Sequence, residues 1–413
     1  AQGVTVMTCH ALAMRLVGAS FAERGGQAEE DFAAVLREAT ALLEGQGLLP
    51  EEADLQRDRL LAGFRWILVD EYQDIGPDQY ALISALAGRK AKDEDSKLTL
   101  LAVGDDDQNI YAFAGASAQF IRRFADDYQA KTHFLVENYR SSAHIIAVAN
   151  AVIAPARSRM KQDHPISINR TRLKSPPGGE WQGRDSVAQG RVQILPAGRD
   201  AEQQAMAVLT EIQRLCSQGL DLKQTAVIAR QWKFLDPLRA ACESLGLPVN
   251  MADEAPPPLW RLRETQSLLT FAQAQGPLVQ AGALLAWLDN HPETPWRACL
   301  HDALAAFADE TQDAEVSLAH FRDWLAEWGR ASRQRQTGLL LLSAHRAKGL
   351  EFEHVFVLDG EWGTQRGEDV DAARRLYYVA MTRARHTLTL ARLEQGNPFI
   401  DQMPESAAVL RRP

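Results

Sequence analysis

The chain has 413 residues, enough for roughly two or three domains of ordinary size. Apolar residues make up 46% of it and charged residues 24%, a balance that excludes an intrinsically disordered protein. The formal net charge of −9 and the isoelectric point of about 5.7 exclude a uniformly basic nucleic-acid coat protein, but they leave room for a locally basic groove.

The cysteines lie far apart and form no CxxC pair, so they predict a reducing compartment, the cytoplasm, rather than a disulfide scaffold: Cys9, Cys216, Cys242 and Cys299. The longest apolar runs, such as Leu98–Val103, have the length of a strand and are too short to cross a membrane. The chain starts at Ala1 without a methionine and within an apparent strand. We therefore expect it to be a piece of a longer polypeptide.

The first third of the chain alternates short apolar runs with amphipathic segments, the pattern of a parallel sheet covered by helices. Residues 66–69 and 98–103 predict buried strands, and both end in acidic residues, where open α/β sheets place ligands. Residues 144–153 carry apolar side chains at helical spacing. We expect residues 1–154 to form a first α/β lobe with a small helical insert at about 18–64.

Residues 155–190 are rich in proline, glycine and basic residues and predict a linker or long surface loop. A second alternating set follows, with strands expected at 192–195, 225–229, 339–342, 354–358 and 388–391, and helices at 201–216, 235–245 and 371–384. We expect residues 191–275 and 336–413 to form a second α/β lobe, with residues 276–335 as a reduced helical insert.

Adjacent acids follow the first predicted strand in the run Leu68-Val69-Asp70-Glu71-Tyr72-Gln73-Asp74. This pattern fits the magnesium-holding strand of nucleotide hydrolases, in which Asp70 would hold the ion and Glu71 would polarise the attacking water. The alternative is a strand end with solvated acids.

Three successive acids, Asp105–Asp107, follow the second predicted strand and must repel one another unless cations or donors lie nearby. The amide of Gln108 can donate to a terminal phosphate and accept from water. Tyr111 and Phe113 can present ring faces to unpaired bases, a contact worth about 1–3 kcal/mol per base. The alternative is that both rings belong to the core.

Basic residues gather in three later segments. Arg140, in Glu137–Ser142, has the planar fork that suits phosphate oxygens, although a single arginine more often pairs with an acid. Residues 343–352 form a charged loop between two predicted strands, and residues 374–385 predict a helix with several arginines. In a chain of negative net charge, this basic cluster needs an anionic partner or nearby acids.

Six blocks in this order resemble superfamily 1 DNA helicases of the UvrD/Rep/PcrA type: Thr8-Cys9-His10-Ala11-Leu12, DEYQD, GDDDQNIYAFAGA, ENYRSS, SAHRAKGLEF and RRLYYVAMTRAR. Together they extend over nearly the whole chain. The resemblance implies two RecA-like lobes, the first truncated, with short helical inserts. It also implies that ATP and Mg²⁺ bind between the lobes and that single-stranded DNA crosses both.

The resemblance also implies a role for each matching residue. Asp70 would hold magnesium, Glu71 would be the catalytic base and Gln108 the sensor of the γ-phosphate. On the nucleotide, Tyr139 would stack on adenine, Glu351 would contact the ribose, Arg140 and Arg383 would reach the γ-phosphate from two sides, and Lys348 belongs with the cofactor-binding residues. The implied DNA contacts are Thr8, His10, Tyr111, Phe113, Ser343 and His345.

The chain departs from the family pattern in three ways. It contains no GxxxxGK[ST] loop, which in this family precedes the Thr8–His10 block, and it lacks the adenine-reading glutamine motif. Without the backbone amides and lysine of that loop, we expect the chain to bind ATP poorly and to hydrolyse it negligibly. Ala114 stands where the family has arginine, which questions the coupling between DNA stacking and the nucleotide site. Both inserts are short, so duplex contacts and autoinhibition assigned to the family's large insert need not transfer.

The favoured interpretation is an ATP-driven helicase that moves 3′→5′ along single-stranded DNA, acts at single/double-strand junctions and serves DNA repair. A pseudo-helicase that only binds DNA or protein is the alternative. A helicase subunit that works with a separate nuclease is a third possibility.

Overall fold

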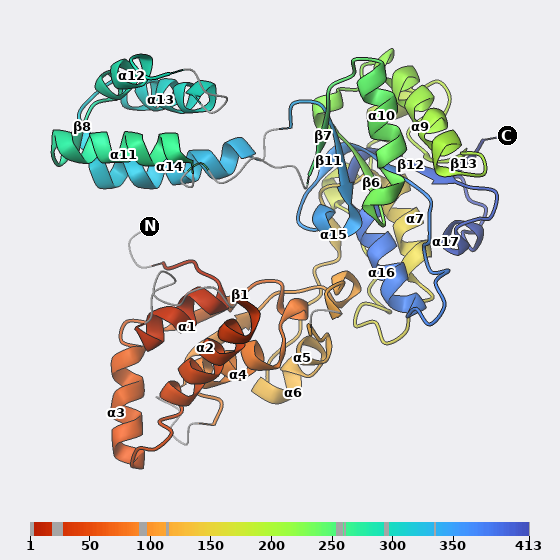
Figure 1. Ribbon diagram of the computed structural model, residues 1–413. Coiled ribbons are helices and arrows are strands. Elements are labelled where there is room, and N and C mark those ends of the chain that lie inside the picture. The colour runs from red at the N-terminus through yellow and green to blue at the C-terminus, as the bar shows by residue number, and fades with distance from the viewer. Residues whose placement is uncertain are drawn as a thin grey trace.

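The computed structural model describes residues 4–18, 28–90, 97–112, 115–252, 259, 262–292, 297–333 and 336–412. It contains two α/β lobes and a separate group of helices (Figure 1). The predicted α/β fold class is therefore confirmed. Among the described residues, no helix combines the length and the apolar character needed to cross a lipid bilayer.

The first lobe is built on a parallel pair of strands, β1 (Trp66–Val69) and β2 (Thr99–Ala102), both at predicted positions. Its helices are α1 (Cys9–Val17), α2 (Ala28–Leu43), α3 (Pro50–Leu60), α4 (Pro77–Ala87), α5 (Gln119–Arg122) and α6 (Phe124–Tyr128). Short 3₁₀ turns follow both strands, η1 (Tyr72–Asp74) and η3 (Asp106–Gln108). Apolar residues of α1, α2 and α4 pack together under one face of the strands, so α2 of the predicted insert belongs to the core of this lobe.

The prediction that β1 and β2 are buried on both faces is wrong. Trp66 and Leu68 of β1 are 67% and 71% exposed, and Leu101 of β2 is 52% exposed. The alternate residues Val69 and Leu100 pack against the core. Side chains alternate between the two faces of a strand, and the described helices cover only one of them.

An edge of β2 is open as well. The amides of Thr99 and Val103 donate to carbonyls of the β1 segment, so those of Leu100 and Ala102 point away from β1. Along this edge lies a cavity of about 910 Å³, with residues 97–106 on one side and residues 127–135 on the other. Within the described part of the chain, β2 pairs with β1 alone.

The second lobe holds a fully parallel seven-stranded sheet with the order β13-β5-β12-β11-β6-β10-β7. Its strands are β5 (Val192–Pro196), β6 (Thr225–Ala229), β7 (Val249–Met251), β10 (Leu339–Ser343), β11 (Phe352–Val357), β12 (Ala384–Arg392) and β13 (Val409–Arg411). Its helices are α7 (Ala143–Ile153), α9 (Ala201–Cys216), α10 (Asp236–Ser244), α15 (Ala344–Ala347), α16 (Val370–Met381) and α17 (Pro398–Asp401), with 3₁₀ turns η6 (Leu222–Gln224) and η7 (Trp232–Phe234).

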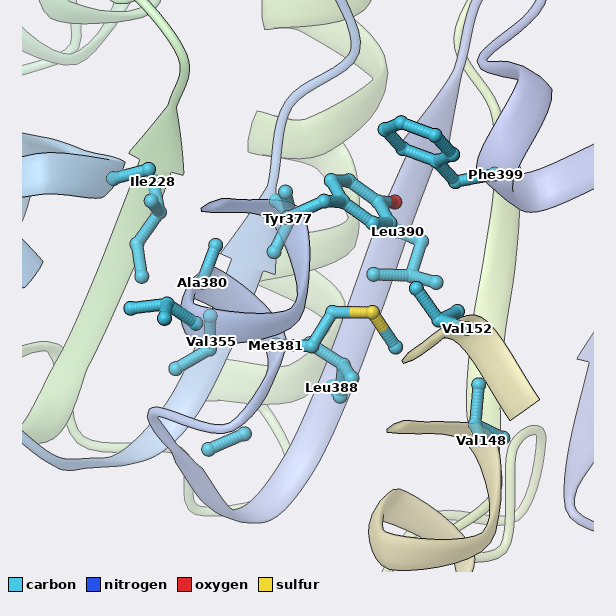
Figure 2. Close-up of a cluster of buried hydrophobic side chains, with 14 of the residues drawn as sticks. Val148, Val152, Ile228, Val355, Tyr377, Ala380, Met381, Leu388, Leu390 and Phe399 are labelled. Atoms are coloured by element: carbon cyan, nitrogen blue, oxygen red, sulfur yellow. The ribbon is translucent and has the colours of Figure 1, made fainter. Parts of the chain in front are cut away.

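Helices cover both faces of this sheet. Helices α7, α16 and α17 pack on one face, where Tyr377 and Met381 meet Leu388 and Leu390 of β12 (Figure 2). Helices α9 and α10 pack on the other face. The near-continuous burial of β6 and β11 is what two-sided cover requires.

Helix α7 belongs to the second lobe and not, as predicted, to the first. Its Ile145, Val148 and Val152 lie in the core under β5 and β12, and Ile153 packs against Tyr378 of α16. The chain therefore crosses between the lobes before α7. The reason is packing, because the apolar residues that cover most of α7 are buried between the seven-stranded sheet and α16.

Residues 155–190 are not a simple linker. They contain β4 (Ser167–Ile168), which pairs with β3 (Glu137–Asn138), together with η5 (Arg170–Arg172) and α8 (Trp181–Arg184). Trp181 is 2% exposed and packs edge-on against His354, and Asp185 accepts hydrogen bonds from Arg214 of α9. These contacts attach the segment to the second lobe.

The helical insert forms a body with its own core, set apart from the sheet (Figure 1). It comprises α11 (Arg263–Gln275), α12 (Ala281–Asp289), α13 (Arg297–Thr311) and α14 (Leu318–Arg333), with a small antiparallel pair, β8 (Leu278–Val279) and β9 (Val316–Ser317). The predicted boundary at residue 276 is too late, because Leu268 and Ala272 of α11 are buried in this core rather than against the sheet.

Candidate functional site

The carboxyl ends of β1 and β2 carry the acids that the sequence singled out. Asp70 is exposed, and its Oδ1 accepts a hydrogen bond from the amide of Glu71 at 2.8 Å. Glu71 adopts a left-handed backbone, with φ of 52° and ψ of 40°. Such a conformation is uncommon for a residue other than glycine, and it persists only where the surroundings impose it.

Gln73 imposes that arrangement and was not singled out from the sequence. Its side chain is fully buried; its amide nitrogen donates to Glu71 and its amide oxygen accepts from the backbone N–H of Asp105 at 2.9 Å. Its backbone carbonyl accepts from Asn109. In the sequence, Gln73 stands out only as an uncharged polar residue among acids. Its burial in the structure is what turns its amide into a fixed link between Glu71 and Asp105.

The three successive acids are neutralised by a segment that follows α7. Arg159 forms two hydrogen bonds of 2.8 Å with Asp107, and Lys161 approaches Asp105 at 2.6 Å. The amide of Met160 donates to Asp106 at 3.0 Å. The predicted need for nearby cations is therefore met, but by residues that lay in the predicted linker. Burial raises the pKa of Asp106, whereas the hydrogen bonds to Asp107 raise the pKa of Arg159.

Gln108 meets Arg383 across the lobe boundary. Its amide oxygen accepts from Arg383 Nη2 at 3.3 Å, while its amide nitrogen donates to Asp105 at 2.9 Å. Arg383 is 3% exposed and also donates to the carbonyls of Val379 and Leu350. Burial, and after it the charge of Arg140, lowers the pKa of Arg383 to about 10, so the guanidinium stays charged at neutral pH.

Arg140 lies at the second-lobe side of the same junction. Its Nε donates to Glu351 at 2.6 Å and its Nη1 donates to the carbonyl of Thr382 at 3.4 Å. The local fold is fixed by Asn138, whose Oδ1 accepts from the amides of Arg140 and Ser141. Tyr139 is 71% exposed.

The resemblance places Lys348 among the cofactor-binding residues, whereas in the structure its ammonium lies among acceptors of the protein itself. It ends α15 in the second lobe, yet its ammonium contacts Asp74, the carbonyl of Gln108 at 2.9 Å and Glu71 at 3.4 Å, all in the first lobe. Its three donors thus have acceptors among protein atoms.

The predicted DNA residues divide into two groups. Tyr111 and His345 lie together across the lobe boundary, where the Tyr111 hydroxyl donates to the carbonyl of His345 at 3.3 Å. The hydroxyls of Thr8 and Ser343 instead accept from the helix amides of Ala11 and Arg346 as N-caps of α1 and α15. His10 follows Thr8 in α1, on the part of the first lobe built with α2 and α4. Phe113 and Ala114 lie outside the described residues.

The residues present fit part of an ATP–magnesium site. Among the described residues, no group of three or more histidines, cysteines or acids is placed to hold a metal by itself. A single exposed carboxylate such as Asp70 nevertheless suits Mg²⁺, which usually takes its other ligands from water and phosphates. The 413 residues contain no GxxxxGK[ST] loop, so the groups that would cradle the other phosphates are not among them.

Three family models match the chain. A UvrD/REP helicase N-terminal domain matches residues 26–129, and two UvrD-like helicase C-terminal domains match residues 133–272 and 338–391. The matched segments fall in both lobes.

Similar proteins carry helicase names. The chain is 30% identical to the ATP-dependent DNA helicase UvrD2 of Mycobacterium tuberculosis over 87% of this chain and 51% of that protein. It is 27% identical to DNA helicase II of Escherichia coli over 83% of this chain and 59% of that protein. It is 26% identical to the putative ATP-dependent DNA helicase YjcD of Bacillus subtilis over 79% of this chain and 51% of that protein. The chain thus spans about half the length of the curated relatives it matches.

Proposed function

Because the chain belongs to the UvrD-like helicases of superfamily 1, we propose that it forms the moving part of an ATP-driven helicase that travels 3′→5′ along single-stranded DNA. Single/double-strand junctions are the proposed substrates. DNA repair is the proposed process, and the scattered cysteines favour the cytoplasm as its location.

One observation carries the proposal. Glu71 and Gln108 of the first lobe lie at one junction with Arg383 and Lys348 of the second lobe. A pair of lobes that only binds DNA has no physical need to bring a strained carboxylate, an amide and buried cations together. A site that hydrolyses a phosphoanhydride between two lobes needs a group that orients the water and a guanidinium that meets the transferred phosphate.

The proposed chemistry follows from these side chains. ATP bound with magnesium at Asp70 would supply a phosphoanhydride bond open to in-line attack. Glu71 would orient the attacking water and accept its proton. Arg140 and Arg383 would hold positive charge against the developing negative charge, a role worth about 10³–10⁵ in rate for an arginine finger. Gln108 touches Arg383 and would report on the occupant of the site to the second lobe.

The DNA path is proposed to run along Tyr111 and His345, which connect the lobes next to this site. Stacking on a ring tolerates any base, as a translocating protein requires. For a single strand, the logarithm of the affinity should fall with the logarithm of the salt concentration by about 0.7 per neutralised phosphate.

We propose that this chain alone turns over ATP negligibly. The open edge of β2 and the exposed Trp66 and Leu68 support the proposal, because no described strand occupies the position next to β2 from which a phosphate-binding loop could reach Asp105 and Asp70. A strand and loop from outside these 413 residues would complete the cradle.

The test compares this chain with a longer polypeptide that also carries a GxxxxGK[ST] loop, called here the loop-containing polypeptide. ATP hydrolysis is measured with and without single-stranded DNA. We expect DNA-stimulated hydrolysis only in the loop-containing polypeptide, and its loss in Glu71→Gln.

Two results would contradict the proposal. Turnover at the unmodified rate by Glu71→Gln would remove the assigned base. DNA binding without any hydrolysis by the loop-containing polypeptide would favour the pseudo-helicase instead.

A further inference from the structure

Lys348 belongs to the second lobe, but its ammonium pairs with carboxylates of the first lobe. Its side chain is 7% exposed, and it directly follows α15, whose Ala344 and Ala347 are buried in the core of the second lobe. The ammonium contacts Asp74 and Glu71 and the carbonyl of Gln108. A buried ammonium with three acceptors is fixed in position, because any movement leaves a charge without a partner.

Asp74 depends on Lys348 in turn. Burial raises the pKa of Asp74, and the hydrogen bond and charge of Lys348 oppose that rise. Its Oδ1 is buried and accepts no hydrogen bond in the described structure, so Lys348 provides the main compensation for its charge. Removing the lysine would leave a carboxylate in a poorly solvated position.

Two residues with different proposed roles, one in hydrolysis and one in DNA binding, lie next to the ammonium of this ion pair. Glu71, the proposed base, lies 3.4 Å from the ammonium. The ring of Tyr111, a proposed DNA contact, has its centroid 5.3 Å from the same nitrogen, within the range of a cation–π interaction. The hydroxyl of Tyr111 also reaches the carbonyl of His345, three residues before Lys348.

We propose that Lys348 and Asp74 are positioning residues that latch the two lobes together and tie the DNA-facing ring of Tyr111 to the carboxylate of Glu71. The inference rests on the proposed function and deepens it. DNA that contacts Tyr111 changes the cation–π interaction with the fixed ammonium and so the strength of its ion pair with Glu71, and a change at Glu71 passes back along the same path. Neither Lys348 nor Asp74 is required to touch the nucleotide.

The first test needs neither DNA nor ATP. Hydrogen exchange is measured on the 413-residue chain as Lys348→Met, Asp74→Asn and the double variant, with Lys233→Met as the control. Lys233 also pairs with a carboxylate, Glu361, but within one lobe.

We expect each latch variant to speed exchange in the opposite lobe by about tenfold, Lys348→Met over residues 72–76 and 106–110, and Asp74→Asn over residues 343–352. Exchange that rises only in the substituted lobe would overturn the latch.

The double variant keeps the test decisive if Lys348→Met alone folds poorly. Losing both partners leaves no uncompensated charge, so the double variant should be no worse than Lys348→Met. Effects that multiply, with the double variant worse than either single one, would show two independent residues and overturn the proposal.

The second test measures binding of a fluorescein-labelled oligothymidylate. We expect the affinity to fall about tenfold in Lys348→Met, to be restored by Lys348→Arg and to be unchanged in Lys233→Met. If the unmodified chain binds no single strand, the proposed function fails, while the exchange experiment still decides on the latch. If it binds and Lys348→Met binds equally well, the link to Tyr111 is wrong.

Discussion

The guanidinium of Arg140 and the carboxylate of Glu351 form an ion pair, with Nε 2.6 Å from Oε2, although the two residues are 211 positions apart. The family resemblance implies that they contact different parts of one nucleotide, the γ-phosphate and the ribose. Their direct contact shows that both point into one space. In this arrangement the guanidinium and the carboxylate neutralise each other, so a ligand that binds either group competes with the ion pair.

Arg140→Ala should therefore affect activity far more than stability. The side chains of Arg140 and Glu351 are 33% and 46% exposed, and an ion pair of this kind contributes about 0–1 kcal/mol. ATP hydrolysis by the loop-containing polypeptide should fall at least about 10³-fold, if the arginine meets the transferred phosphate. Arg170→Ala is the control, because Arg170 also pairs with a glutamate, at 86% exposure. Turnover within a few-fold of the unmodified rate would remove Arg140 from the site.

Gly104→Ala should destabilise the chain and disturb Glu71. A Cβ at Gly104 would lie 2.7 Å from Cδ1 of Ile121 and closer still to the side-chain oxygen of Gln73, which holds Glu71 in place. We expect a loss of about 1–3 kcal/mol in the free energy of unfolding, the usual effect of overpacking. Gly183→Ala, in α8, meets nothing within 4 Å and should stay within about 0.5 kcal/mol. Equal urea midpoints for the two variants would contradict this account.

Leu100 and Leu101 are neighbours on β2 with opposite surroundings. Leu100 packs against the core with Tyr72 and Phe120, whereas Leu101 is 52% exposed. Leu100→Ala should cost this chain about 2–5 kcal/mol, and Leu101→Ala less than about 0.5 kcal/mol. In the loop-containing polypeptide the cost of Leu101→Ala should rise, if added structure covers that face. An unchanged cost there would mean that the face stays open.

His354 should make the chain sensitive to mild acid. Burial, with a smaller effect from His386, lowers the pKa of His354 from 6.5 to about 4. Between these values the unfolded chain binds a proton that the folded chain does not. Stability is therefore complete above about pH 6.5 and falls by about 3 kcal/mol as the pH drops to 4.

The matched variant for this prediction is His354→Asn, which can keep the hydrogen bond to Thr387 but does not titrate. Urea unfolding between pH 4 and 7 should show a shallower slope for this variant. Some slope should remain, because burial also lowers the pKa values of His144 and His345. An identical slope would show that His354 is not the group responsible.

Local patterns were enough to predict much of the second lobe. Residues 201–216 and 225–229 form α9 and β6 at the predicted positions, because each carries the periodicity of a segment buried in a complete layered sheet. The first lobe shows the limit of this reasoning. The apolar residues of β1 and β2 predicted burial on both faces. Whether a face is buried depends on the segments that pack on it, and the sequence of the strand does not reveal these.

The candidate site shows the same division. Repulsion among Asp105–Asp107 predicted nearby cations, but only the folded chain identifies Arg159 and Lys161, more than fifty residues away, as their source. Three adjacent aspartates are enough to predict that cations or hydrogen-bond donors lie nearby. The residues that meet it are set by the path of the chain after α7.

The assignment of α7 to the second lobe has a practical consequence for dissecting the protein. A polypeptide that begins near residue 137 retains β3, α7 and every strand of the seven-stranded sheet, with helices on both faces. Limited proteolysis should release this portion as a resistant fragment, whereas the portion before it, in which the described helices cover one face of the β1–β2 pair, should be digested. The protease would thus cut the molecule earlier in the chain than the proline- and glycine-rich stretch suggests.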